Sequence, residues 1–333
     1  MFLFLPACAN RGSENNPVFR TQDGLLGTVI NVSVYENVKE QVLTDMVARV
    51  RDIDAMMASR SALSDLSALN NSSGEAFTPP RALYDVIAAG LDWSARSNGA
   101  FDITIGPLVT LWDIGGTPKV PDQDRVDAAK ALVDYKKVEM DPQGPSVRLQ
   151  PGTRIDLGGI AKGYACDEAA AMLRDAGVGH AILDFGGNIY TIGAKPSGAL
   201  WKIAIKTPVI GEQGYIGLLQ VSDAAVVTSG PYERYFEQDG ALFHHILDPD
   251  TGYPAQSGLL SVTIVCDSAM QADALSTACF VMGAEKGLGF LSGIEGAEAV
   301  FVLDDFSVRV TKGLTGCFQL LDERFDLYEA DFT

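Results

Sequence analysis

Positive charge is scarce in this sequence. Its 333 residues include 25 Lys and Arg against 43 Asp and Glu, which gives a formal net charge of −18, and no cluster of basic residues stands out. Because nucleic-acid binding depends on neutralising phosphates with Lys and Arg, the composition argues against a DNA or RNA partner. An acidic surface of this kind more often serves solubility than a specific cationic partner.

Long apolar runs and metal-type cysteine pairs are also missing. No stretch approaches the roughly 20 apolar residues that a helix needs to span a bilayer. Cys166, Cys266, Cys279 and Cys317 lie in apolar contexts without C-x-x-C spacing, so small buried hydrophobic residues are favoured over zinc ligands or disulfides. With 47% hydrophobic residues, the chain can bury the core of one large domain or of two intermingled lobes.

The first residues have features of an export signal. In MFLFLPACAN a small residue precedes Cys8, and the polar stretch NRGSENN follows. This resembles a bacterial lipoprotein cleavage box, although no basic residue precedes the apolar segment, which is also shorter than usual. We expect residues 1–20 to form a signal remnant and flexible tether, with a lipid anchor at Cys8 that holds the protein at the inner membrane, facing the periplasm or outer surface. The alternative is that Cys8 is accidental.

Periodic patterns in the rest of the chain predict a mixture of strands and helices. Helices are expected at 39–57, 81–97, 124–135, 161–175 and 270–291, and strands dominate from residue 137 onward. This order argues for an α+β fold with a mainly antiparallel sheet and flanking helices. No linker divides 21–333, which we treat as one domain. The expected strands are 28–35, 138–140, 146–149, 181–185, 189–192, 201–205, 216–221, 259–265, 299–303 and 308–310.

The stretch RIDLGGIAKGYACDEAA (154–170) runs from a strand end through a glycine pair into a helix. Gly158 and Gly159 let the backbone approach a ligand closely, and the helix offers N–H groups and a positive dipole end to an anion. Lys162 would then pair with phosphate. The spacing is not that of a P-loop, and taken alone a Gly-Gly turn before a helix is more often a tight turn than a phosphate cradle.

The stretch LDFGGNIYTIG (183–193) predicts a β-hairpin. Gly186, Gly187 and Asn188 would form its tight turn. Hairpin geometry accounts for this stretch fully.

Paired histidines stand out in TSGPYERYFEQDGALFHHILDPDTGYP (228–254), because the chain has only three histidines. They lie next to a polar turn at 248–252. Histidine is the side chain best suited to act as a general base near neutral pH. A histidine in a strand is nevertheless more often a packed or hydrogen-bonded core residue.

The stretch ADALSTA (272–278) places a carboxylate and two hydroxyls in an apolar helix. Asp273, Ser276 and Thr277 stand at i, i+3 and i+4, so they project from one face. They could form a polar patch whose hydroxyls bond back to the preceding turn. They could equally form half of a site for Mg²⁺, which prefers carboxylate, hydroxyl and carbonyl oxygens, with free carbonyls of the Gly158–Gly159 turn completing the set.

The order and wording of six stretches together resemble the successive signature blocks of the ApbE family, the FAD:protein FMN transferases of the bacterial cell envelope. The resemblance extends from GLLGTVINVSVY (24–35) through SDLSALN (64–70) to about residue 312 and covers nearly the whole chain. The six blocks are GAFDITIGPLVTLWDIG (99–115), RIDLGGIAKGYACD (154–167), LDFGGNIYTIG (183–193), TSGPYERYF (228–236), FHHILDPDTGYP (243–254) and SVTIVCDSAMQADALSTACFVMG (261–283).

The resemblance implies a two-lobed, T-fold-related α+β architecture that binds FAD with its pyrophosphate near Mg²⁺. It implies a reaction that cleaves FAD, attaches FMN through a phosphoester to a threonine of an acceptor envelope protein, and releases AMP. Such a displacement relies on charge neutralisation and positioning. Two alternatives stay open: an FAD pyrophosphatase that gives free FMN and AMP, and a non-catalytic flavin-binding lipoprotein.

Position by position, the resemblance also implies roles for individual residues. Its metal ligands fall on the backbone of Gly159 and on Asp273 and Thr277, with Ser276 where some members place a carboxylate. His245 is the candidate base for the acceptor hydroxyl, His244 is the second choice, and Asp273 is the other catalytic residue. The positions that contact FAD are Leu26, Arg60, Ala100, Phe101, Asp102, Asp156, Lys162 and Leu247.

Three positions depart from the family pattern. Leu26 stands where many members have Met. Residues 59–61 read Ser-Arg-Ser where many members have Ser-Thr-Tyr, and that tyrosine lies by the flavin, so Arg60 is expected to alter stacking on the isoalloxazine ring or to favour hydrolysis over transfer. Pro231 replaces a residue that is commonly small and polar, which removes a backbone N–H.

Overall fold

The computed structural model describes residues 17–141 and 143–330, and a nine-stranded sheet lies at its centre. Neighbouring strands run antiparallel except for the final pair, which is parallel. In spatial order the strands are β1 (Val18–Leu25), β2 (Thr28–Val34), β5 (Ala181–Phe185), β6 (Asn188–Ile192), β9 (Ala225–Ser229), β12 (Leu259–Cys266), β13 (Glu298–Leu303), β14 (Ser307–Thr311) and β16 (Asp326–Ala330).

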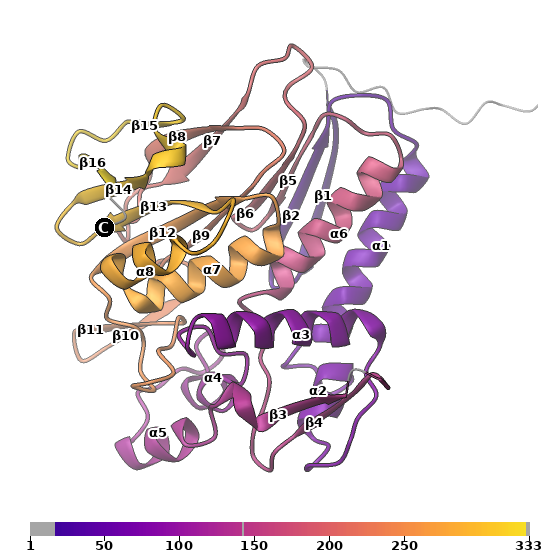
Figure 1. Cartoon of the computed structure of the whole chain (residues 1–333), viewed down its shortest axis with the longest axis vertical. Coiled ribbons are helices and arrows are strands. Elements are labelled where there is room, and N and C mark those ends of the chain that lie inside the picture. Colours follow the sequence, from indigo (N-terminus) through magenta and orange to yellow (C-terminus); the bar gives the residue numbers. More distant parts are fainter. Residues whose placement is uncertain (1–16, 142, 331–333) are drawn as a thin grey trace, which may run out of the picture.

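Helices cover one face of this sheet, and a smaller three-stranded sheet packs on the other (Figure 1). Because both faces are covered, a central strand such as β12 is buried along almost its whole length. Alternate strand residues therefore enter one of two apolar cores. The covering elements are α1 (Glu40–Met57), α6 (Ala161–Asp175) and α7 (Ala269–Met282) on one face, and β7 (Trp201–Lys206), β8 (Tyr215–Val221) and β15 (Phe318–Leu320) on the other.

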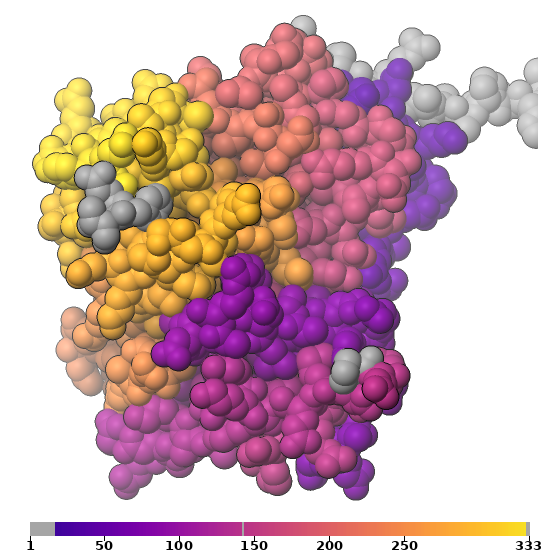
Figure 2. Space-filling view, viewed as in Figure 1, coloured from indigo at the N-terminus to yellow at the C-terminus, as the bar shows by residue number. Residues whose placement is uncertain are grey.

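A second lobe lies below the sheet in Figure 1, and on the face seen in Figure 2 it is in continuous contact with the α7 segment. A small apolar core around Trp112 joins part of this lobe to a two-stranded hairpin, β10 and β11, whereas other buried residues of the lobe, such as Leu66, Leu83 and Val147, belong to the main core. The elements here are α2 (Asp65–Asn70), α3 (Arg81–Arg96), α4 (Gly106–Trp112), α5 (Gln123–Lys130), η1 (Tyr135–Lys137), β3 (Val138–Asp141), β4 (Ser146–Leu149), β10 (Tyr235–Gln238) and β11 (Ala241–His244). The remaining elements are α8 (Ala284–Leu291) and η2 (Lys312–Leu314).

The α+β class, the mainly antiparallel sheet and the flanking helices are confirmed. The single helix predicted at 270–291 was wrong: α7 and α8 are separated by Gly283, whose φ of 80° ends the first helix. The helix predicted at 124–135 was too long, because α5 ends at Lys130 and only a short 3-10 turn follows.

The N-terminal predictions concern mostly residues that the structure does not describe. Cys8 and the rest of residues 1–16 lie outside the described residues, so the lipid anchor stays a prediction. Strand β1 begins at Val18, within the stretch 1–20 that we assigned to the tether. Across 17–141 and 143–330, no helix combines the length and the apolar character needed to cross a bilayer.

Candidate functional site

The first turn of α6 packs closely against α7. Gly163 permits this approach, because a β-carbon there would collide with the backbone of Ala269 and Met270. The N–H of Gly163 donates a 3.1 Å hydrogen bond to Oδ2 of Asp273. Since α6 has no capping side chain of its own, the Asp273 carboxylate supplies an acceptor at the helix N-terminus. Asp273 is 3% exposed, so this charge is held inside the protein.

The ammonium of Lys162 lies between two oxygens that attract a cation. Its Nζ is 3.5 Å from Oδ1 of Asp273 and 3.4 Å from the carbonyl oxygen of Gly158. Both distances are long for charge-assisted hydrogen bonds. The lysine side chain is 20% exposed and that of Asp273 is 5% exposed. The pair is therefore largely buried but loosely closed, in the sense that its atoms are too far apart for a strong hydrogen bond.

The glycine turn brings the two lobes together at this point. Oδ1 of Asp156 accepts a 2.9 Å hydrogen bond from the N–H of Gly158, which fixes the turn. A β-carbon on Gly159 would lie 3.1 Å from Cε2 of Phe101 in the second lobe and 3.3 Å from Oγ1 of Thr277 in α7. The absence of a side chain at Gly159 therefore lets its backbone lie next to both lobes.

The two hydroxyls of α7 have different surroundings. Oγ of Ser276 donates to the Asp273 carbonyl at 3.0 Å and lies 2.8 Å from Oγ of Ser229, so it is occupied by the fold. Thr277 is only partly buried and is next to Gly159. Of the two candidate hydroxyl ligands, Thr277 is the one that faces the glycine turn.

His245 is oriented by the backbone of Arg234. Its Nδ1 lies 3.2 Å from the Arg234 carbonyl oxygen, and since a carbonyl can only accept, Nδ1 carries the proton and Nε2 keeps a free lone pair. Burial of the ring, followed by the nearby cations Arg234 and Lys162 and then His244, lowers the pKa of His245 to about 3. His245 is therefore neutral near pH 7 and can accept a proton at Nε2.

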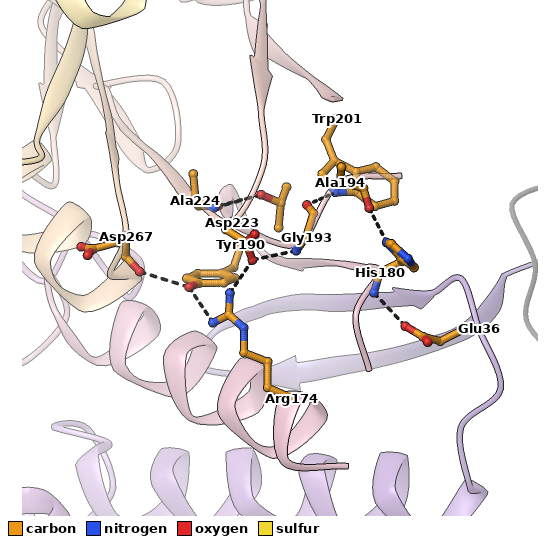
Figure 3. A network of polar contacts seen from close by, with 11 residues as sticks. Glu36, Arg174, His180, Tyr190, Gly193, Ala194, Trp201, Asp223, Ala224 and Asp267 are labelled. Carbon is orange, nitrogen blue, oxygen red and sulfur yellow. Dashed lines mark hydrogen bonds and ion pairs between the residues drawn. The ribbon is translucent and has the colours of Figure 1, made fainter. Parts of the chain in front are cut away.

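The other two histidines are tied into the fold. His244 is buried, donates from Nε2 to the Ala255 carbonyl at 3.0 Å, and accepts at Nδ1 from the N–H of Ile246. Burial lowers its pKa as well. His180 donates from Nδ1 to the Ala194 carbonyl at 2.7 Å, far along the sheet in the network of Figure 3. His244 therefore has both ring nitrogens engaged, and of the two histidines that keep Nε2 without a hydrogen bond among the described residues, only His245 lies near Lys162.

Arg234 and Glu233 belong to the same surroundings but were not singled out from the sequence. Burial raises the pKa of Glu233, Lys162 acts against this rise, and Asp273 adds to it, which places the carboxyl among the charges of the site. Both residues lie inside the block TSGPYERYF, so the family resemblance was the signal that could have found them.

The turn between β1 and β2 reaches Arg234. Leu26 and Gly27 form it with positive φ angles of 53° and 68°, as a two-residue hairpin requires. A β-carbon on Gly27 would lie 3.2 Å from Nη2 of Arg234. A leucine at positive φ is strained, and the contact of Leu26 with FAD stays a prediction.

Asp102 is occupied by the fold. Its Oδ1 accepts from the N–H and Oγ1 of Thr104 at 2.7 and 2.6 Å, and its Oδ2 accepts from the N–H of Tyr135 at 2.9 Å. Burial nevertheless raises its pKa. The structure thus gives this carboxylate a part in holding the segment after α3, beside its predicted contact with FAD.

Among the described residues, Asp273 forms no hydrogen bond or ion pair with Arg60, Leu247 or Ala100. Arg60 is exposed and forms a 3.0 Å ion pair with Asp113 after α4. Leu247 is buried in the apolar core around Trp112. Ala100 is partly buried in the turn between α3 and Phe101. Their predicted contacts with FAD stay predictions.

The donor set at the junction of the lobes suits a hard cation. Among the described residues, no three or more His, Cys, Asp and Glu side chains converge on one point. Asp273, Thr277 and the carbonyls of the glycine turn nevertheless offer carboxylate, hydroxyl and carbonyl oxygens, the ligands of Mg²⁺, which completes its shell with water and phosphate oxygens. Lys162 and the N-terminus of α6 lie alongside, and both attract phosphate groups. The fold and this site together therefore define an α+β protein equipped to bind phosphorylated ligands.

Comparison with known proteins makes the assignment specific. A family model described as the ApbE family matches residues 26–301, and this chain belongs to that family. The FAD:protein FMN transferase of Treponema pallidum (strain Nichols) is 35% identical over 324 residues, 91% of this chain and 89% of the relative. That of Klebsiella pneumoniae (strain 342) is 34% identical over 319 residues, 95% and 99% of the two chains.

Solved structures agree. The crystal structure of an ApbE protein from Thermotoga maritima is similar with a TM-score of 0.83 at 32% identity, over 90% of this chain and 99% of that one. The flavin transferase ApbE from Vibrio cholerae is similar with a TM-score of 0.80 at 26% identity, over the same shares of the two chains, 90% and 99%.

Proposed function

We propose that this chain is a Mg²⁺-dependent FAD:protein FMN transferase. It cleaves FAD, attaches FMN through a phosphoester to a threonine of an acceptor protein, and releases AMP. The observation that supports this most directly is the loosely closed pair of Lys162 and Asp273 beside the glycine turn, in a chain of the ApbE family. A diphosphate has the charge that Lys162 and the α6 N-terminus would bind.

Three groups of the chain would hold Mg²⁺: the Gly159 carbonyl, the Asp273 carboxylate and the Thr277 hydroxyl. When bound, the metal would neutralise charge on the phosphate oxygens. Lys162 adds a second positive charge on the same side and orients the diphosphate. Phe101 lies beside Gly159 and would shield a phosphate bound there from water.

His245 would remove the proton of the acceptor threonine. The Arg234 carbonyl holds its Nδ1–H, so Nε2 is the atom that accepts the proton. A base with a pKa of about 3 is weak, but bound phosphate would offset the cations Lys162 and Arg234 and raise that pKa toward the range in which general bases work.

The test is to incubate the protein with FAD, Mg²⁺ and an acceptor domain that carries a flavinylation threonine. Mass spectrometry should show the acceptor heavier by FMN, with one AMP released per acceptor modified, and EDTA should stop both. An unmodified acceptor with free FMN and AMP would indicate hydrolysis. FAD binding without any AMP would indicate a non-catalytic flavin-binding protein and contradict the proposal.

Hydrolysis is the second candidate because of Arg60. Its guanidinium is paired with Asp113, and the next residue, Ser61, stands where the family resemblance leads us to expect an aromatic ring beside the flavin. Without that wall, water would reach the phosphorus more easily. Replacing Ser61 by tyrosine should raise the ratio of transferred to free FMN, whereas D113N, which removes the ion pair of Arg60, should leave the ratio within about twofold of wild type.

We also propose that the protein works in the bacterial cell envelope, anchored by a lipid on Cys8. The sequence pattern around Cys8 supports this. Substituting Cys8 by serine in cells should move the protein from the membrane fraction to the released fraction, and an unchanged distribution would contradict the anchor.

A further inference from the structure

The side chain of Asn188 is not explained by the hairpin in which it lies. Asn188 is 2% exposed, and its Nδ2 is buried without a hydrogen-bond partner among the described residues. The backbone of Asn188 pairs with Phe185 across the turn and with Val227 of β9. Glycines 186 and 187 therefore account for the turn, and the amide group of Asn188 is left over. Buried amide donors without partners are rare because they lower stability.

The position of Asn188 brings its backbone against helix α6, whose first turn carries Lys162. Asn188 and Tyr190 lie on the same face of β6, since side chains alternate along a strand. The Tyr190 hydroxyl accepts a hydrogen bond from Arg174 of α6, so this face is directed at that helix. The Asn188 carbonyl contacts Sγ of Cys166 at 4.0 Å. Cys166 is one helical turn from Lys162.

The neighbouring turn approaches the site from another side. A β-carbon on Gly187 would lie 3.6 Å from Oε1 of Glu233, and Glu233 is close enough to Lys162 and Asp273 for their charges to affect its pKa. Burial does not exclude a ligand contact at Asn188, because binding sites are mostly apolar and orient their ligands with a few placed polar groups, Asn side chains among them.

We propose that Asn188 is a binding residue of the site and donates a hydrogen bond from Nδ2 to an oxygen of the ligand's diphosphate. This inference rests on the proposed function, because it takes FAD as the ligand. Phosphate oxygens accept hydrogen bonds, and an amide adds direction to the charge that Lys162 supplies. In this account the Asn188 amide has no acceptor within the protein because the bound ligand supplies one.

The test compares two nearly isosteric apolar replacements on β6. N188L removes the unpaired amide, and T191V removes a hydroxyl that is fully paired, since Oγ1 of Thr191 both donates to and accepts from Ala224 at 3.1 Å. Thermal unfolding is measured without ligand. Dissociation constants for FAD are measured by flavin fluorescence in EDTA, which prevents turnover, and those for ADP by displacement of FAD. N188A repeats the test with a smaller side chain.

We expect N188L and N188A to unfold at or above the wild-type temperature and to bind both FAD and ADP about tenfold more weakly. T191V should unfold at a lower temperature and bind both ligands as wild type does. Three results would overturn the proposal: affinities within twofold of wild type, as a resident water on the amide would give; a loss of FAD affinity without loss of ADP affinity; or a fall in unfolding temperature as large as that of T191V. If wild type binds no FAD, the proposed function itself fails.

Discussion

Each end of helix α6 carries an ion pair, and the two pairs differ in how closely their atoms approach. At the C-terminal end, Arg174 donates to Asp223 at 2.8 Å and to the Tyr190 hydroxyl at 2.9 Å (Figure 3). At the N-terminal end, Lys162 and Asp273 are 3.5 Å apart. The closely bonded pair is the more exposed one, with side chains 40% and 59% exposed, against 20% and 5% for the loose pair.

This difference separates groups that build the fold from groups that await a ligand. Asp223 also accepts from the Gly193 N–H at 2.8 Å, and the Tyr190 hydroxyl donates to the Asp267 carbonyl at 3.1 Å, so the C-terminal end is satisfied internally. Buried charges need good partners to offset lost hydration. Lys162 and Asp273 lack such close partners, and in the proposed function a cation and an anion from outside would complete that end.

The largest effect is expected for D273N. Loss of the carboxylate charge removes the proposed metal ligand and should lower the rate of AMP release from FAD by about 100-fold to 1,000-fold. The matched control is D223N at the other end of α6, which should retain activity within about twofold of wild type. Wild-type AMP release by D273N would remove this residue from the site.

His245 should come next. H245Q deletes the base and is expected to slow FMN transfer by about 100-fold or more while FAD affinity changes little, as single-turnover kinetics and flavin fluorescence can show. In H244Q, by contrast, the loss of buried hydrogen bonds should lower the unfolding temperature. If H244Q rather than H245Q slowed transfer in folded protein, the roles of the two histidines would be reversed.

Substitution of Arg174 should affect stability and leave catalysis intact. R174L removes hydrogen bonds to Tyr190 and Asp223 and is expected to cost about 1–2 kcal/mol, seen as a fall of roughly 2–4 °C in unfolding temperature. AMP release per folded molecule should stay at the wild-type value. A loss of activity larger than the loss of folded protein would show that the C-terminal network also serves the reaction.

A further expected effect, which is small near neutral pH and grows in acid, is a pH dependence of stability. The folded protein keeps His245 neutral down to about pH 3, whereas the unfolded chain protonates it near pH 6.5. Unfolding therefore takes up a proton between these values, so stability falls as pH decreases through this window. Chemical denaturation at several pH values should show a shallower fall in H245Q, and identical slopes would contradict the lowered pKa.

The sequence was a good guide to the long elements of the fold and a poorer one to the short elements. Apolar periodicity located α1, α3 and α6, but α2 and α4 are too short to show a helical period. The hairpin β10–β11 was predictable from the Asp-Gly pair at 239–240. This pair favours two-residue hairpin turns, and both residues do adopt positive φ in the structure. The helix after Ser268 was predicted without its break at Gly283, because apolar residues continue on both sides.

For the site, the sequence indicated which residues share a helix face and could not show which polar groups are already used. Asp273, Ser276 and Thr277 do share one face of α7, yet the Ser276 hydroxyl is bonded to Ser229 on β9. Asp102 is likewise held by Tyr135 from a distant segment. Such pairings arise between segments far apart in sequence, where local spacing carries no information.

The most direct test of the account is a crystal structure of D273N soaked with FAD, since a variant with little turnover should retain the intact ligand. The account predicts that a diphosphate oxygen lies about 3 Å from Nζ of Lys162, at the N-terminus of α6. FAD bound elsewhere, with Lys162 still facing only residues of its own chain, would contradict it.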